Sequence, residues 1–465
     1  MRIEHDSLGD LELPDNAYYG IQTQRAVQNF PVSGLRPHPI FIRAYAELKK
    51  ACTIVNVETG ALKEKVIADA IIQACDEIIA GKFADQFVTD VFQAGAGTST
   101  NMNLNEVIAN RALEIIGEPR GTYTKISPND HVNMSQSTND TYPTAMRLAG
   151  LLLLRDNLFP AIDELANAFE AKEKEFADAV KSARTHLQDA VPITLGQEFG
   201  AWKAMLQHHK IRLEEARADL SELGIGGSAA GSGLNTPEGY SELVVRILSK
   251  QLKFDLLLSE NLFEAMQSLA PFVHLMSALK NCALDILKIS ADLRLIASGP
   301  MTGFAEIQLP AVQPGSSIMP GKVNPSILEM VSQVALHVVG AEAAVAMASQ
   351  AGQLELNVMM PVVQFNMCFA LQIFSNALRI TSEKCITGIT ANRERMLHFA
   401  ESSSSLITAL APEIGYLKAA EIAMESLRTK RSIREIVLER GLIPEARLTK
   451  ILDVLEMTRA KRPKR

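Results

Sequence analysis

Apolar residues recur at three- and four-residue spacing along most of the chain, which is the pattern of helices that bury one face. From about residue 40 onward this pattern predicts helical segments at 41–58, 64–81, 143–178, 197–222, 238–252, 260–297, 326–350 and 361–387. Several are roughly two to three times the length of an average helix, so we expect them to pack along one another in a bundle. Pro160 and Pro271 are expected to kink or break two of them.

The two ends of the chain have a different pattern. Residues 1–30 contain short alternating runs separated by a Gly-Asp pair, which predicts a small β-hairpin. After residue 392 the chain becomes more polar, and shorter helical patterns follow at 417–428, 432–440 and 444–456. We therefore expect a mainly α-helical protein with a mostly helical N-terminal domain (1–140), a central long-helix bundle domain (141–392) and a small C-terminal helical domain (393–465).

The segments 326–350 and 361–387 are unusually apolar and rich in small residues. A monomer with such helices on its outside would expose a large apolar patch. Two interpretations follow, a helix buried in the core of one domain or a helix shared between subunits. The pattern favours neither of them.

Composition narrows the class of protein. Of 465 residues, 47% are hydrophobic and 21% charged, as in a soluble globular protein, and the net charge of −7 gives no support for a nucleic-acid partner. The basic end RAKRPKR (459–465) is interpreted as a solvated tail. The N-terminus lacks the apolar core of a signal peptide, and LAGLLLL (148–154) is too short to span a bilayer, so we expect no membrane segment.

Cysteine usage predicts a reducing compartment. The five cysteines are odd in number and widely spaced, without a CxxC or CxxH pair, so neither a zinc site nor a disulfide framework is expected. We therefore expect a cytoplasmic protein.

Polar, glycine-containing breaks interrupt the helical pattern at 93–105, 133–140, 184–189, 224–236 and 298–325. None of them fits a P-loop, and the match to a dinucleotide-binding glycine motif is weak because no strand–helix–strand context surrounds it. An HExxH motif, an EF-hand spacing and a GxSxG elbow are also missing from the sequence, so no metal site is predicted. The breaks instead combine Thr, Ser, Asn and His with Lys322, a set of donors that suits a small dicarboxylate. Taken singly, such Ser and Thr residues are more often turn or cap residues.

Together, these breaks carry a family resemblance. GSSIMPGKVNP (315–325) matches the signature of the fumarase/aspartase superfamily without a gap, and further matches are GTSTNMNLNEVIANRA (97–112), SQSTNDTYPTA (135–145), RTHLQDAVPITLGQE (184–198) and GLNT (233–236). The sequence resembles this superfamily over essentially its whole length. The resemblance implies the three-domain superfamily fold and a homotetramer around a central helical bundle, with each active site shared between three subunits. It also implies an elimination that needs no cofactor.

Within the superfamily, QAGAGTSTNMN with Ser99-Thr100, and AGQLELNVMMP (351–361), look like aspartate ammonia-lyases. ELGIGGSAAGSGLNT is closer to fumarases, and Met360 and Ala411 depart from the usual aspartase residues. The resemblance implies reversible elimination of ammonia from L-aspartate to give fumarate. The alternatives are a class II fumarate hydratase, another amine–fumarate lyase with a larger substrate, and a non-catalytic scaffold similar to lens crystallins.

The resemblance also implies roles for single residues. Ser316 would be the general base, acting as an alkoxide, and Lys322 and Asn324 would hold the carboxylate on which negative charge builds. Glu329 would pair with His186 and set its charge and tautomer. The remaining residues expected to contact the substrate are Thr98, Ser137, Thr138, Asn139, Thr185, His186 and Ser317. The loop 315–325 would act as a mobile lid, and Pro325 would start the helix that follows it.

Overall fold

The computed structural model describes residues 1–459, and these residues are mainly helical, as the pattern predicted. The helices are α1 Ile21–Asn29, α2 Pro39–Glu58, α3 Lys65–Ile79, α4 Thr98–Ile115, α5 Thr138–Leu153, α6 Phe159–Glu175, α7 Leu195–Leu220, α8 Tyr240–Leu252, α9 Leu262–Gln267, α10 Ala270–Ile296, α11 Ser326–Gln350, α12 Met360–Lys384, α13 Arg393–Ser402, α14 Ile407–Ile414, α15 Tyr416–Thr429, α16 Ile433–Glu439, α17 Glu445–Ile451 and α18 Val454–Met457.

Within residues 1–459 the strands form four two-stranded sheets. They are β1 Arg2–Asp6 with β2 Gly9–Leu13, β3 Val180–Thr185 with β4 Gln188–Thr194, β5 Glu222–Leu223 with β6 Leu257–Leu258, and β7 Ile307–Gln308 with β8 Thr390–Ala391. The first pair is antiparallel, with Arg2 opposite Leu13, which confirms the predicted N-terminal hairpin.

By its internal contacts the chain divides into two compact units. The first unit contains Met1–Pro160, His209–Leu284 and Val334–Asn376, and the second contains Ala161–His208, Asp285–Gln333 and the residues from Ala377 onward. The long helices α6, α7, α10, α11 and α12 each have residues in both units. The three-domain boundaries at 140 and 392 remain a prediction.

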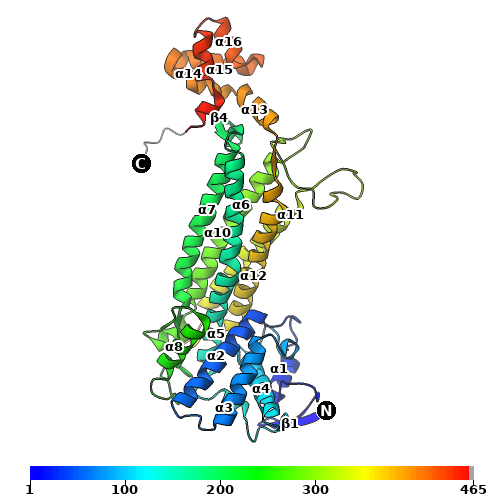
Figure 1. Cartoon of the computed structure of the whole chain (residues 1–465), viewed down its shortest axis with the longest axis vertical. Coiled ribbons are helices and arrows are strands. Elements are labelled where there is room, and N and C mark those ends of the chain that lie inside the picture. The colour runs from blue at the N-terminus through cyan, green and yellow to red at the C-terminus, as the bar shows by residue number, and fades with distance from the viewer. Residues whose placement is uncertain (460–465) are drawn as a thin grey trace. The chain divides into compact units, whose positions relative to one another are not determined.

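In the first unit, α2 packs against α3, α5 and α8, and α3 packs against α4 (Figure 1). The contact between α2 and α5 is aromatic, because the Phe41 ring lies edge-on to Tyr142 with ring centres 4.9 Å apart. Tyr45 lies edge-on to the same ring at 6.1 Å. This packing fixes the start of α5 beside α2, and that start carries several candidate site residues.

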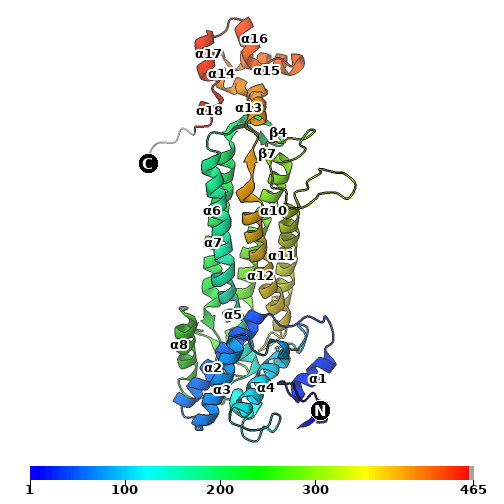
Figure 2. The ribbon, with the colours of Figure 1, turned by 45° about the vertical axis from the view of Figure 1, so that its right-hand side comes forward.

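In the second unit, the segments of the long helices that belong to it run side by side (Figure 2). Phe169 of α6 contacts Phe199 and Trp202 of α7, with ring centres 5.9 and 6.0 Å apart. Phe199 and Trp202 are 4.9 Å apart. These rings provide a packed apolar layer between α6 and α7.

Proline interrupts the helices where the sequence predicted it. The segment 143–178 is divided into α5 and α6 by a π-helical turn, Leu154–Leu158, and Pro160 is the second residue of α6. Pro271 is likewise the second residue of α10, just after α9 ends at Gln267. At Pro271 proline is tolerated because the first backbone N–H groups of a helix have no partner within the helix. At Pro160 the helical backbone continues, and the π-helical turn just before the proline accommodates it.

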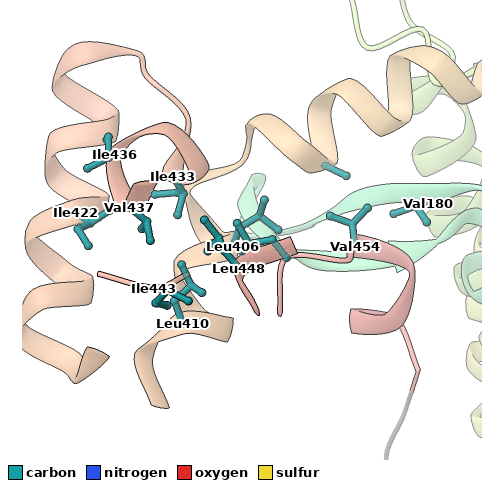
Figure 3. Packing of buried hydrophobic residues seen from close by; sticks show 12 residues of the cluster. Val180, Leu406, Leu410, Ile422, Ile433, Ile436, Val437, Ile443, Leu448 and Val454 are labelled. Atoms are coloured by element: carbon teal, nitrogen blue, oxygen red, sulfur yellow. The ribbon is translucent and has the colours of Figure 1, made fainter. Parts of the chain in front are cut away.

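The C-terminal helices α14 to α17 surround a small apolar core (Figure 3). Its side chains include Leu410, Ile422, Ile436 and Leu448, and the cluster extends to Val180 of β3. The pattern at 444–456 predicted one helix, but the structure has two, α17 and α18. Asp453 separates them because its side chain accepts hydrogen bonds from the first N–H groups of α18, those of Leu455 and Glu456.

Helix α11 has two faces that are both poor in charge. Its buried positions include Val331, Ala335 and Val338. Its exposed positions are Gln333, Leu336, His337, Gly340, Ala343, Met347 and Gln350. Its length and apolar composition would also fit a membrane-spanning helix, but the mostly buried core helix of a soluble protein fits the same description.

Candidate active site

The N-termini of α4 and α5 lie next to each other in the first unit. Asn101, in the first turn of α4, donates from Nδ2 to Oγ1 of Thr138, the first residue of α5, at 2.9 Å. Gly97 precedes α4 with φ 84°, and a Cβ there would lie 2.2 Å from the Tyr142 ring of α5. Because both helices begin here, their two positive dipole ends are directed at the same region, although Ser137 accepts from the Asn139 N–H and Gln93 accepts from the Thr100 N–H.

Four predicted substrate-contacting residues belong to these two helix starts. Thr98 is the exposed first residue of α4. Ser137 caps α5 in a capping box with Asp140. Thr138 is buried against Asn101, and Asn139 donates from Nδ2 to the carbonyl of Ala229 at 2.9 Å. The structure therefore brings these four residues together, and three of them also have structural hydrogen bonds.

The sequence indicated a polar break at 93–105, whereas α4 begins at Thr98. Thr and Asn are poor helix formers, which hid this start. In the structure the first turns of α4 are held by side-chain contacts. Gln93 accepts from the backbone N–H of Thr100 at 2.9 Å, and the Thr100 hydroxyl lies 2.9 Å from that of Thr89. Thr100, one of the two residues that look aspartase-like, therefore has a structural role.

A buried lysine lies beneath these helix starts, and sequence reasoning missed it. Lys49 of α2 is 0% exposed, and its Nζ donates to Oδ1 of Asn133 and Oε1 of Gln136, both at 2.9 Å. Burial lowers the pKa of Lys49 to about 8. Oδ1 of Asn133 also accepts from Asn101 and Asn105 at 3.2 and 3.1 Å. Lys49 thereby ties α2, α4 and the turn before α5 together.

Asp140 joins the break at 224–236 to the same region. Its Oδ2 accepts from the backbone N–H groups of Gly226 and Ser228, both at 3.0 Å. The side chain is fully buried, and this burial raises the pKa of Asp140 to about 6. The stretch 224–236 therefore folds around the Asp140 carboxyl group. The same stretch accepts the hydrogen bond of the Asn139 amide, at the carbonyl of Ala229.

The signature loop 315–325, in the second unit, closes on itself. The Gly315 N–H donates to the carbonyl of Lys322 at 2.8 Å, and Nδ2 of Asn324 donates to the carbonyl of Gly315 at 2.6 Å. These two bonds form the neck of a loop that projects from the ends of α10 and α11 (Figure 1). One N–H of the Asn324 amide is thus committed to the loop.

Ser316 lies inside this loop with backbone donors directed at its hydroxyl. Its Oγ accepts from the N–H groups of Ile318 and Met319 at 3.2 and 3.0 Å. Donors in this arrangement stabilise negative charge on the oxygen. Ser317 and Lys322 are exposed, and the Lys322 ammonium makes no hydrogen bond or ion pair with any residue in 1–459. The loop therefore presents one supported hydroxyl and one unpaired cation.

Thr185 and His186 lie at the end of the hairpin β3–β4. The sequence indicated a polar loop at 184–189, but Thr185 pairs with Gln188, and the turn consists only of His186 and Leu187. Both turn residues have positive φ, 53° and 59°, as in a type I′ turn. Residues other than glycine seldom have a positive φ, and clusters of residues that do often mark functional positions.

Glu329 lies in the first turn of α11, and its N–H donates to the carbonyl of Pro325 at 3.1 Å. Helix α11 thus starts immediately after Pro325, as predicted. Among residues 1–459 of one chain, His186 and Glu329 form no hydrogen bond or ion pair with each other. Their pairing remains a prediction, which a pair formed between two chains would satisfy.

The candidate residues divide between the two units. Thr98, Ser137, Thr138 and Asn139 belong to the first unit. The residues in the second unit are Thr185, His186, Ser316, Ser317, Lys322, Asn324 and Glu329.

Comparison with known protein families gives the same result as the sequence motifs. A family model described as Lyase matches residues 9–340, and a model described as Fumarase C C-terminus matches residues 406–459. The chain belongs to the fumarase/aspartase superfamily of lyases.

Relatives in this superfamily match almost the entire chain. Aspartate ammonia-lyase of a Bacillus species is 47% identical over 98% of this chain and 97% of its own, and that of Pseudomonas aeruginosa is 48% identical over 97% and 95%. A fumarate lyase:delta crystallin structure from Brucella melitensis, bound to cobalt, is 48% identical with a TM-score of 0.96 over 99% of this chain and 100% of that one. The class II fumarase of Schistosoma mansoni is 33% identical, with a TM-score of 0.95 over 98% and 99%.

Within residues 1–459, no group of three or more His, Cys, Asp or Glu side chains is arranged to hold a metal ion. The five cysteines are all buried, and none of them forms a disulfide. Burial raises the pKa of Cys52 to about 12, so this thiol stays protonated at neutral pH.

Proposed function

We propose that this protein is an aspartate ammonia-lyase, which converts L-aspartate reversibly to fumarate and ammonia. The observation that carries the proposal is 47–48% identity to aspartate ammonia-lyases over 97–98% of the chain. The class II fumarase that matches the fold is only 33% identical.

The reaction must remove a weakly acidic proton from the carbon next to a carboxylate. Its removal adds negative charge to an existing anion, so the enzyme must stabilise the resulting aci-carboxylate more than the substrate. We assign the role of general base to Ser316. Its Oγ accepts hydrogen bonds from the N–H groups of Ile318 and Met319. These donors support the role of base because they stabilise an alkoxide.

The substrate carboxylates would be held by two kinds of group. Lys322 and Asn324 would hold the carboxylate on which charge builds, with Ser317 beside them. Thr98, Ser137, Thr138, Asn139, Thr185 and His186 would bind the other carboxylate and the amino group. Holding both ends fixes the amino group anti to the departing proton, which lowers the entropic part of the barrier.

We further propose a cytoplasmic homotetramer whose sites are each shared between three subunits. The uncharged outer face of α11 supports an assembly, since four turns of exposed Leu, Gly, Ala and Met are typical of helices that pack closely together. The loop 315–325 would close over the substrate as a lid.

The function is tested by following fumarate absorbance after adding L-aspartate or L-malate to the purified protein. We expect fumarate to form from L-aspartate. Formation from L-malate alone would favour the second candidate, a fumarate hydratase, which the fold match to class II fumarase supports. Formation from neither would favour the two remaining alternatives, an amine–fumarate lyase with a larger substrate or a non-catalytic scaffold.

The base assignment is tested by Ser316→Ala, with Ser317→Ala as the matched control. Removal of a general base lowers kcat by on the order of 10²–10⁴-fold. Ser317→Ala should mainly raise KM, since its exposed hydroxyl is assigned to binding. A normal kcat in Ser316→Ala would refute the role of Ser316 as the base.

A further inference from the structure

A cluster of charged side chains is buried beneath the hairpin β3–β4 in the second unit. Glu306 is 0% exposed, and its Oε1 accepts from Nη1 of Arg184 at 2.8 Å. Lys181, 1% exposed, places Nζ 2.9 Å from Oε2 of Glu306 and 2.8 Å from Oε2 of Glu198. The Lys181–Glu306 contact has the distance of an ion pair without hydrogen-bond geometry, so Oε2 of Glu306 accepts no hydrogen bond.

These charges lie on elements that are distant in sequence. Lys181 and Arg184 belong to β3, whereas Glu306 directly precedes β7, which leads toward the loop 315–325. The Glu306 backbone is held from both sides. Its N–H donates to the carbonyl of Ile296 at the end of α10, at 2.9 Å, and its carbonyl accepts from Asn392 just before α13, at 2.8 Å. Glu306 is therefore a fixed point to which β3 is attached.

Arg184 is held in addition by aromatic rings. Its guanidinium lies 4.3 Å from the centre of the Phe304 ring and 5.7 Å from that of Phe399 in α13. Arg395 of α13 donates from Nε to the carbonyl of Phe304 at 2.8 Å. Arg184 thus has one orientation, and it directly precedes Thr185 and the strained turn at His186.

Stability alone does not explain such a cluster. Replacing a buried ion pair with apolar side chains is often neutral or stabilising, because the desolvation of both charges costs as much as their attraction contributes. Buried ion pairs do impose one arrangement on the elements that they join, since any other leaves a buried charge without a partner.

We propose that Glu306 is a positioning residue for substrate binding, which acts by holding Arg184 and Lys181. It fixes the end of the hairpin, where Thr185 and His186 lie, relative to β7 and the entry to the signature loop. The inference rests on the proposed function only in assuming that Thr185 and His186 contact the dicarboxylate.

The test is Glu306→Gln in the full-length enzyme. Glutamine keeps the size of the side chain and one acceptor but removes the charge that holds both cations. We expect KM for L-aspartate to rise by on the order of 10-fold, with a smaller change in kcat, because displaced groups bind the substrate less well. KM does not depend on the fraction of folded enzyme, so a merely structural role would leave it unchanged.

Two further variants make the test specific. Arg184→Lys keeps the charge but loses the planar fork and its stacking on Phe304, and it should raise KM similarly even if Glu306→Gln does not fold. The double variant should be no worse than the stronger single one, since both changes break the same contact. The control Glu175→Gln removes the ion pair with Lys172 of α6 in the same unit, 2.7 Å long, and should leave KM unchanged.

The experiment distinguishes failure of the positioning role from failure of the proposed function. The wild-type enzyme is assayed first with both substrates, and the affinity of every variant for fumarate, which is common to both reactions, is measured by calorimetry. Activity with L-malate alone would overturn the proposed function and leave the fumarate affinities to decide this inference. Unchanged KM and unchanged fumarate affinity in Arg184→Lys and in folded Glu306→Gln would overturn the positioning role.

Discussion

At the residue scale, the carboxylate of Glu106 in α4 caps a helix to which it does not belong. Its Oε2 accepts from the N–H groups of Gly20 and Thr23 at 2.8 and 3.1 Å, and its Oε1 accepts from Gln22 at 2.8 Å. These are the first donors of α1, whose own cap, Gly20, has no side chain. Together with Glu4, which accepts from the N–H of Ile21 at 2.8 Å, this carboxylate satisfies the open end of α1, and it attaches the N-terminal segment to α4.

Glu106 should make stability depend on pH. Burial raises its pKa from the usual 4.5 to about 7, although the hydrogen bonds that it accepts act in the opposite direction. Between these values the unfolded chain loses the proton while the folded chain keeps it. The contribution of Glu106 to the free energy of unfolding should therefore fall by up to about 3 kcal/mol as the pH rises from 4.5 to 7. Glu106→Gln cannot titrate, so the stability difference between wild type and variant should shrink over this range.

Denaturant unfolding at a series of pH values measures this difference, and Glu77→Gln is the control. Hydrogen bonds from Arg111 hold the pKa of Glu77 below its usual value. Its stabilising contribution is therefore present above the unfolded-state pKa and is lost as the pH falls through the folded-state pKa. A stability difference for Glu106→Gln that widens between pH 4.5 and 7 would contradict the expectation.

At the element scale, the signature loop is a closed unit with its own internal support. Its neck requires glycine at position 315, because a Cβ there would lie 2.5 Å from the carbonyl oxygen of Lys322 and 2.7 Å from the backbone nitrogen of Asn324. Gly321 has a different requirement. Its φ is 80°, but a Cβ there would meet nothing within 4 Å. A larger residue at position 315 is therefore excluded by lack of space, whereas at position 321 it is disfavoured only by the backbone conformation.

Gly315→Ala should force the neck open and displace Ser316 from the N–H groups of Ile318 and Met319. We expect kcat to fall by on the order of 100-fold with little change in thermal stability, since the loop is exposed. Gly321→Ala is the matched variant, because it strains the backbone by about 1–2 kcal/mol without blocking the neck, and it should lose less activity. Equal losses in both variants would show that closure of the neck is not what matters.

The sequence pattern predicted some elements of this protein correctly and missed others. The periodicity of α2, α3, α7, α8 and α12 gave their positions to within a few residues, because each buries one continuous apolar face. Helix α4 was hidden because its first turns consist of Thr, Ser and Asn, whose partners are Gln93, Thr138 and Asn133. The hairpin β3–β4 was missed because its turn, His186-Leu187, has none of the residues typical of type I′ turns.

At the scale of the whole molecule, the outer face of α11 indicates assembly. Leu336 is 61% exposed and Met347 is 66% exposed, and Gly340 lies between them with open space around it. A glycine that nothing in its own chain requires allows another helix to approach closely. Of the two interpretations of 326–350, the subunit-shared helix therefore has the stronger support.

Leu336→Glu should disrupt the assembly, because it introduces a charge into an apolar contact. We expect light scattering to report a species smaller than the tetramer proposed for the wild type, with loss of activity because the candidate residues no longer meet. Val66→Glu is the control, since Val66 is 68% exposed on α3 and outside α11. It should leave both mass and activity unchanged, and a fully active monomer in either protein would exclude shared sites.

The sequence by itself determined the helical class, the helix irregularity at Pro160 and the helix start at Pro271, the N-terminal hairpin and the identity of the signature loop. All of these depend on residues that are close together in the chain, where spacing and backbone preference act directly. Only the tertiary structure decided that Lys49 is the cation beneath the starts of α4 and α5, and that Arg184 meets Glu306, 122 residues away. A buried charge has a role only through its partner, and in this protein folding, not local sequence, brings the two together.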